Sequence, residues 1–127
     1  MIVYPAILTK ENTGYFISFP DLEGCFSEGR DLKESIKMAE EALGGYVASM
    51  FDRNIDIPVP SELTNISFCP KTQSAVLIYS HADKYFSQKK AVKKTLTVPA
   101  WLNAKAEQRG LNFSQVLQEA LIEQLGI

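Results

Sequence analysis

The segment Lys93-Lys94-Thr95-Leu96-Thr97-Val98-Pro99 decides how the C-terminal part of the chain can fold. Alternate residues of an extended strand point to opposite sides. One side of this strand carries Lys93, Thr95 and Thr97, and the other side carries Lys94, Leu96 and Val98. Pro99 ends the strand, because proline cannot donate a hydrogen bond to a neighbouring strand but suits the first turn of a helix.

The predicted strand has no partner nearby in the sequence, so its backbone N–H and C=O groups would be left unpaired in a single chain. The same strand of a second copy, related by a two-fold axis, satisfies these groups most simply. Two such strands form an antiparallel ribbon that fits the major groove of DNA. We therefore predict that Lys93, Thr95 and Thr97 contact DNA. Leu96 and Val98 would face the core of the dimer.

Two helical patterns follow this strand. The first runs from about Pro99 to Arg109 and stops at Gly110, a residue suited to a left-handed C-terminal cap. The second begins at the N-cap Asn112, with Gln115 three residues on, as in a capping box. A strand and two helices in this order resemble the ribbon-helix-helix repressors. The whole unit has only about 35 residues, too few to bury a core alone, so dimerisation would be part of its folding.

The resemblance to these repressors implies a DNA-binding and dimerisation domain at residues 89–127. The apolar residues of its dimer core would be Leu96, Val98, Leu102, Val116, Leu117 and Leu121. The first free N–H groups of the second helix, around Phe113 and Ser114 after the cap Asn112, are expected to point at a DNA phosphate. The helix dipole would favour that contact.

Residues 1–88 read as an α+β domain with a four-stranded sheet and one long helix, in the order β-β-β-α-β. The strands are expected at residues 2–8, 15–19, 25–29 and 74–80. Turn-forming residues separate the first three strands, which predicts an antiparallel meander. The fourth strand is nearly all apolar, which predicts an interior position. Because it follows a helix crossover, it is expected to lie parallel to its neighbour, in the sheet order 3-2-1-4.

The long helix is expected to begin after Asp31, an N-cap residue, with Glu34 as its reciprocal partner. One apolar face toward the sheet is formed by Leu32, Ile36, Ala39, Leu43, Val47 and Met50. Gly44 and Gly45 interrupt this helix, and each costs about 1 kcal/mol of helix propensity relative to alanine. A close approach of the helix backbone to the sheet would explain these glycines.

Charge is unevenly distributed along the 127 residues. Residues 1–88 contain 7 Lys and Arg against 12 Asp and Glu, a net charge of −5, and residues 89–127 contain 6 against 3, a net charge of +3. An acidic part and a basic part suggest two partners of opposite charge.

The composition also predicts where the protein works and which groups it lacks. No apolar run approaches the ~20 residues that cross a bilayer. Cys25, Cys69 and the single His81 show no metal-binding spacing. We therefore expect a cytoplasmic protein with reduced thiols and with no metal or other cofactor.

Several short motifs together resemble the HicB-type antitoxins. They are Tyr4-Pro5-Ala6, Gly14-Tyr15, Phe19-Pro20-Asp21-Leu22, Gly24-Cys25, Ser27-Glu28-Gly29 and Glu40-Glu41-Ala42-Leu43. The resemblance covers nearly the whole chain. The chain departs from the family at Glu23, where proline is frequent, and residues 61–72 match no motif. The resemblance implies a truncated ribonuclease-H-like domain joined to a small DNA-binding domain.

The resemblance further implies a role in a toxin–antitoxin pair. Residues 1–88 would bind a small, basic, RNA-cleaving HicA-type toxin and mask its RNA-binding surface, through residues that the sequence does not identify. Residues 89–127 would form a homodimer and repress the operon of the pair. Whether such dimers pair further stays open.

Two other functions also fit the residues. One is a stand-alone ribbon-helix-helix repressor whose N-terminal domain binds a small ligand. The other is a metal-dependent nuclease with a DNA-binding tail, which would need several carboxylates around two divalent ions. The candidate carboxylates are Asp21, Glu23, Glu28, Asp31 and Glu34. Most of them are explained as turn residues or helix caps, so we expect no enzymatic activity.

Overall fold

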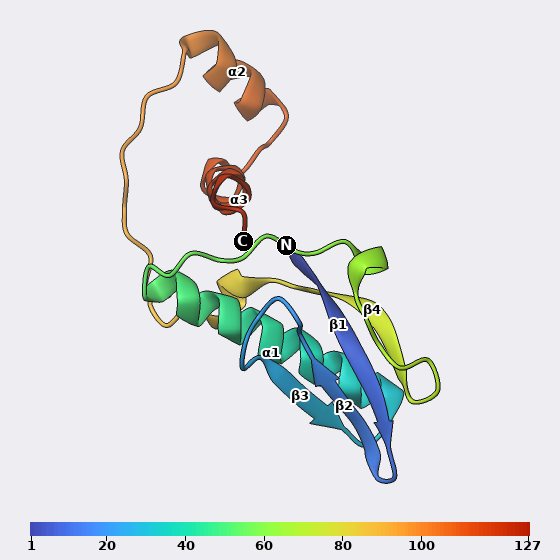
Figure 1. The fold of residues 1–127 in the computed structure, drawn as a ribbon. Helices are drawn as coiled ribbons and strands as arrows, with labels where there is room; N and C mark the ends of the chain where they lie inside the picture. Colours follow the sequence, from blue (N-terminus) through green and yellow to red (C-terminus); the bar gives the residue numbers. More distant parts are fainter. The chain divides into compact units, whose positions relative to one another are not determined.

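The computed structural model describes residues 1–127 and has an α+β fold. Its contacts divide the chain into two compact units, Met1–Phe86 with Ile127 and Ser87–Gly126. The first unit contains four strands and the longest helix, and the second contains two helices (Figure 1). No helix combines the length and the apolar character that a membrane span needs.

The four strands of the first unit form one antiparallel sheet. They are β1 (Ile2–Glu11), β2 (Gly14–Ser18), β3 (Phe26–Gly29) and β4 (Gln73–Ser80). Their spatial order is β3-β2-β1-β4, which confirms the predicted order. Gly14 follows the turn between β1 and β2 with φ +150°, and a Cβ there would lie 2.1 Å from the Gly29 carbonyl oxygen. This position therefore requires glycine.

The fourth strand runs antiparallel to β1, whereas the sequence predicted a parallel strand. Ile2 is opposite Ser80, and Thr9 is opposite Gln73. β4 also lies at the edge of the sheet and not in its interior, and Leu77 is 55% exposed. The interior position was wrong because a run of apolar residues does not show how many sides of a strand are covered.

The long connection between α1 (Leu32–Asp52) and β4 explains this direction. α1 returns the chain to the start of β1, where the Tyr4 hydroxyl donates a hydrogen bond to the Pro58 carbonyl. The chain then runs back along the sheet, and at the far end of β1 the Lys10 N–H donates to the Thr72 carbonyl at 2.9 Å. The preference for parallel crossovers holds when a helix leads directly into the next strand, and here an extra segment reverses the direction.

The helix α1 begins where the sequence predicts. The Asp31 carboxylate accepts a hydrogen bond from the Glu34 N–H at 2.8 Å. The Glu34 side chain does not complete the capping box, because it accepts a hydrogen bond from Arg30 Nε at 2.9 Å. The cap is therefore one-sided, and the exposed Arg30–Glu34 ion pair contributes little stability.

The core of the first unit lies between α1 and one face of the sheet (Figure 1). Large side chains that are fully buried include Ile17, Leu22, Leu43, Val47 and Ile78. The Ser80 hydroxyl at the end of β4 is also buried, and it donates a hydrogen bond to the Glu40 carbonyl at 2.7 Å. Apolar packing and this hydrogen bond together hold α1 against β4.

The two neighbouring glycines of α1 have different surroundings. A Cβ at Gly44 would lie 2.3 Å from the Tyr85 ring and 2.6 Å from the Ser80 hydroxyl, whereas nothing lies within 4 Å of a Cβ at Gly45. Tyr85 belongs to the short 3-10 helix η2 (Ala82–Tyr85), which follows β4. The predicted close approach is therefore confirmed for Gly44 and not for Gly45.

We expect Gly44→Ala to lower the free energy of unfolding by about 1–3 kcal/mol, because the added methyl group overpacks the contact with η2 and β4. The matched variant Gly45→Ala is expected to raise it by about 0.5–1 kcal/mol, because alanine favours a helix where space is free. Urea unfolding of both variants measures the difference. Equal effects of the two substitutions would contradict the close packing at Gly44.

The second unit contains α2 (Ala100–Gln108) and α3 (Phe113–Leu125), which confirms the two predicted helices. Gly110 between them has φ +66°, the left-handed conformation expected after a helix end. The Asn112 side chain caps α3 by accepting a hydrogen bond from the Gln115 N–H at 3.1 Å. The segment before α2 forms no strand in a single chain. Its predicted partner is a second copy, so the ribbon-helix-helix arrangement stays a prediction.

Candidate functional site

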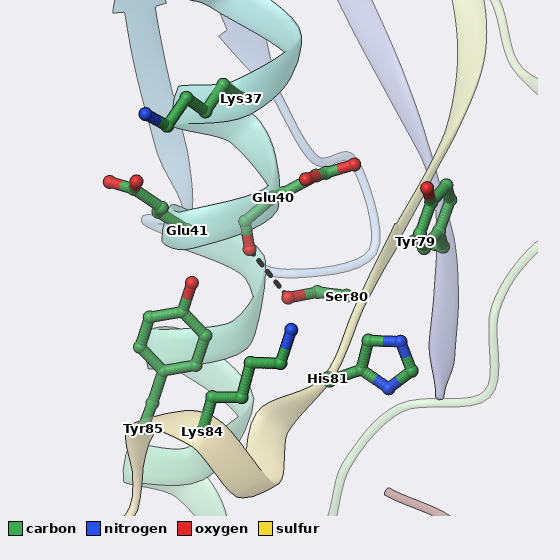
Figure 2. A pocket seen from close by; sticks show the side chains of 8 residues that line it. All are labelled: Lys37, Glu40, Glu41, Tyr79, Ser80, His81, Lys84 and Tyr85. Atoms are coloured by element: carbon green, nitrogen blue, oxygen red, sulfur yellow. Dashed lines mark hydrogen bonds between the residues drawn. The ribbon is translucent and has the colours of Figure 1, made fainter.

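A polar hollow of about 340 Å³ lies between α1, the end of β4 and η2 (Figure 2). It is lined by Lys37, Glu40, Glu41, Tyr79, Ser80, His81, Lys84 and Tyr85. Burial and then the charges of Glu41 and Glu40 raise the pKa of Tyr85. Because two lysines and two glutamates line the hollow, its charges largely compensate and it favours neither an anion nor a cation.

This hollow holds His81, the single histidine of the chain, but no arrangement for nucleophilic catalysis. Figure 2 shows Ser80 pointing toward α1 and away from His81, with its hydroxyl bonded to the Glu40 carbonyl. A serine in this position has no base to accept its proton. No group of three or more His, Cys, Asp or Glu side chains in the chain could hold a metal ion.

The carboxylates considered for nuclease chemistry occupy separate structural positions. They are Asp21, Glu23, Glu28, Asp31 and Glu34. Asp21 accepts hydrogen bonds from the N–H and the hydroxyl of Ser61, at 2.9 and 2.6 Å. It thereby ties the connection before β4, with its 3-10 helix η1 (Leu63–Asn65), to the turn after β2. Asp31 and Glu34 belong to the start of α1, so these acids do not form a two-metal centre.

A second hollow, of about 490 Å³, lies at the end of the sheet where β1 turns into β2. It is lined by Glu11, Thr13, Gly14, Tyr15, Glu28, Gly29, Arg30, Glu34 and Met38. Three glutamates against one arginine make this hollow acidic. Arg30 pairs with Glu34, so Glu11 and Glu28 stay without an ion pair.

Two aromatic side chains lie beside these glutamates on the outer face of the sheet, the face that points away from α1. Ile17 is fully buried in the core, so its neighbour Phe16 points to the outer face. Paired residues share a face, and Glu28 is opposite Phe16. The rings of Phe16 and Phe26 lie 5.7 Å apart between centroids, and Phe26 is 61% exposed.

Glu11 belongs to the same face, because it pairs with Gly14, two residues before Phe16 on β2. We call Glu11, Phe16, Phe26 and Glu28 the aromatic–carboxylate patch. Sequence reasoning missed it, because alternation along β2 does not show which face the helix covers. The available signal was the spacing of the two phenylalanines, which a β2–β3 hairpin brings together.

The predicted DNA-contacting residues of the second unit are all exposed. They are Lys93, Thr95, Thr97, Asn112, Phe113 and Ser114. Phe113 and Ser114 are the first two residues of α3, so their N–H groups stand at the positive end of the helix dipole. These groups are therefore accessible to an anion such as a phosphate.

The predicted dimer-core residues are largely open to solvent in the single chain. Leu96, Val98, Leu102, Val116 and Leu121 are exposed, and Leu117 is half-buried. α3 has no buried residue, although its apolar side chains recur at helical spacing. An exposed apolar stripe of this kind is typical of a helix face that packs against another protein surface.

The two cysteines differ in reactivity for structural reasons. Cys25 is buried, its thiol contacts the Ala42 carbonyl at 3.7 Å, and burial raises its pKa to about 11. Cys69 is exposed, and its pKa is lowered because the Lys71 N–H and then the Thr72 hydroxyl stabilise the thiolate.

In the folded protein at about pH 8, we expect a thiol reagent such as iodoacetamide to modify Cys69 at least about 100-fold faster than Cys25, because only the thiolate reacts. Mass spectrometry of a time course measures both rates, and addition of urea should equalise them. Equal rates in the folded chain would show that Cys25 is not protected by burial.

Comparison with known proteins shows that most of the chain is similar to antitoxin sequences. The family model for the HicB_like antitoxin of bacterial toxin-antitoxin system matches residues 4–120. An uncharacterised 14.9 kDa protein of Haemophilus phage HP1 is 30% identical over 107 residues, which span 84% of this chain and 80% of the phage protein. Antitoxin HicB 1 of Photorhabdus laumondii is 38% identical over 58 residues, 45% of this chain and 37% of that protein.

Solved structures show the same similarity over both units. A chain of a toxin–antitoxin complex from Streptococcus pneumoniae is 28% identical, with a TM-score of 0.62 over 97% of this chain and 98% of that chain. A crystal structure of antitoxin HicB3 is 27% identical, with a TM-score of 0.54 over 97% of both chains. The antitoxin HicB of Burkholderia pseudomallei, 22% identical, shares the fold with a TM-score of 0.62 over 98% of this chain and 99% of that chain.

Proposed function

Because this chain belongs to the HicB-like antitoxins of bacterial toxin–antitoxin systems, we propose that it binds and masks a small RNA-cleaving toxin of the HicA type and represses the operon of the pair. The similarity to the chain from the Streptococcus pneumoniae toxin–antitoxin complex carries this proposal, since it extends over 97% of the sequence at 28% identity. The role is that of a binding protein and not of an enzyme.

The first unit is proposed to bind the toxin. A protein that cleaves RNA must bind phosphates and therefore carries positive charge on its substrate-binding surface. The net charge of −5 over residues 1–88 is complementary to such a surface. Occupation of that surface by the antitoxin would exclude RNA.

The second unit is proposed to bind operator DNA as a homodimer. Its net charge of +3 over residues 89–127 favours contact with phosphates. A second copy would pair with the unpaired segment before α2 and would cover the exposed apolar stripe of α3. The paired strands would present Lys93, Thr95 and Thr97 to the major groove. The N-terminus of α3 would bind a phosphate beside it.

The test of the antitoxin function is co-expression with the toxin of the proposed pair, a small protein that would be encoded by a neighbouring reading frame of the same operon. We expect that frame alone to arrest growth, co-expression of this chain to restore growth, and the two proteins to co-purify. A folded chain that neither restores growth nor forms a complex would refute the proposal. Release from DNA by a small molecule, in the absence of the toxin, would instead favour a stand-alone repressor.

A further inference from the structure

We propose that the aromatic–carboxylate patch (Glu11, Phe16, Phe26 and Glu28) is the surface on which the toxin docks, through a basic segment of the toxin. This inference rests on the antitoxin function proposed above and assigns that function to a place on the first unit. The occupant is a protein segment that carries arginine or lysine next to apolar side chains.

The chemistry of the patch selects such a segment. Glu28 lies directly opposite Phe16 across the β2–β3 pair, and the Phe16 ring lies 5.7 Å from the Phe26 ring. A cation above an aromatic ring is attracted by its negative face, and a carboxylate beside the ring adds charge-assisted hydrogen bonds. Arginine gains most from this combination, because its planar guanidinium can stack on a ring and at the same time donate hydrogen bonds to a carboxylate.

The charges around the patch favour a basic partner over an acidic one. The strand residues that share the outer face include Glu11 and Glu28 and no lysine or arginine. Lys10 points to the opposite face, because it is the direct neighbour of Glu11 on β1. Neither Glu11 nor Glu28 forms an ion pair within the chain, so both carboxylates are available to a partner. A second copy of this acidic unit would be repelled here.

The shape and exposure of the patch also fit docking. The hollow of about 490 Å³ is lined by Glu11 and Glu28 but by neither phenylalanine, so it adjoins the patch at the end of the sheet. It has room for a long basic side chain. Phe26 lies on β3, a short strand at the sheet edge, and 61% of its surface is exposed. It therefore contributes little to the core. An exposed aromatic side chain on an edge strand attracts unwanted association unless a partner covers it.

The experiment compares toxin affinity of single variants in the full chain by calorimetric titration with the purified protein of the neighbouring reading frame. We expect Phe26→Ser and Glu28→Lys each to raise Kd by at least about tenfold, and Glu28→Gln to raise it less. Leu77→Ser is the matched control, because Leu77 is a similarly exposed apolar residue (55%) on the same face at the opposite edge strand. Its Kd should stay within about twofold of the unchanged chain.

The outcomes separate this inference from the function on which it rests. If the unchanged chain binds the toxin and the Phe26 and Glu28 variants bind equally well, the docking surface is elsewhere and the antitoxin function stands. A loss of binding in Leu77→Ser alone would place the contact at β4 and would also overturn the inference. If the unchanged chain does not bind the toxin, both proposals fail. Circular dichroism checks that each variant is folded. If Phe26→Ser does not fold, Glu28→Gln still tests the inference.

Discussion

Replacement of Lys93, Thr95 and Thr97 together by alanine is expected to abolish sequence-specific DNA binding while α2, α3 and toxin binding stay intact. In the proposed dimer these three side chains form the open face of the ribbon, and each good base contact contributes about 1–3 kcal/mol of discrimination. Fluorescence anisotropy with operator DNA and with scrambled DNA measures both specific and non-specific affinity.

The control for this experiment is Lys94→Ala, which removes the same charge from the neighbouring residue on the opposite side of the strand. We expect it to weaken specific binding much less than Lys93→Ala. If Lys93 contacts only a phosphate, its replacement should weaken binding to all sequences evenly and lower the slope of affinity against salt by about 1. Unchanged operator affinity in the triple variant would refute the ribbon assignment.

Local backbone chemistry was readable from the sequence. The caps at Asp31 and Asn112 each satisfy an N–H three residues ahead, as predicted, and Gly110 adopts the left-handed conformation that ends α2. These features depend on residues within one turn of a helix, so no knowledge of the fold is needed. Both capping boxes are incomplete, because the side chains of Glu34 and Gln115 bond Arg30 and Glu119 instead.

Features that depend on distant parts of the chain were not readable. The direction of β4 is set by contacts across long sequence separations, between Tyr4 and Pro58 and between Asp21 and Ser61. Periodicity within α1 predicted a buried Leu32, but this side chain is 53% exposed. A hydrophobic pattern shows which side of a helix is apolar, but not how many residues on that side are buried by other parts of the chain.

The proposed docking patch and the proposed DNA-binding surface differ in whether the sequence alone could predict them. Strand alternation predicted Lys93, Thr95 and Thr97 as DNA contacts, because the other side of that strand carries Leu96 and Val98. In β2 both sides carry apolar residues, so Phe16 and Ile17 could each have been the core residue. Only the position of α1 distinguishes them, since it buries Ile17.

Truncation after residue 88 is expected to separate the two proposed activities completely. The core of the first unit is formed by α1 and the four strands, all within Met1–Phe86, so residues 1–88 should fold alone. We expect this fragment to bind the toxin and to restore growth, but to give no shift of operator DNA. Loss of the second unit should also remove the dimer that forms through it, which analytical ultracentrifugation would detect as a lower mass.

Residues 89–127 provide the reciprocal fragment. Most apolar residues of this fragment are exposed in a single copy, so its stability should depend on protein concentration and its folding should accompany dimerisation. It should bind DNA weakly and give no protection from the toxin. A gel shift and a growth assay on the two fragments therefore form one experiment. If folded, soluble residues 1–88 gave no protection, toxin binding would require the C-terminal dimer, and both the division of function and the docking patch on the sheet would have to be revised.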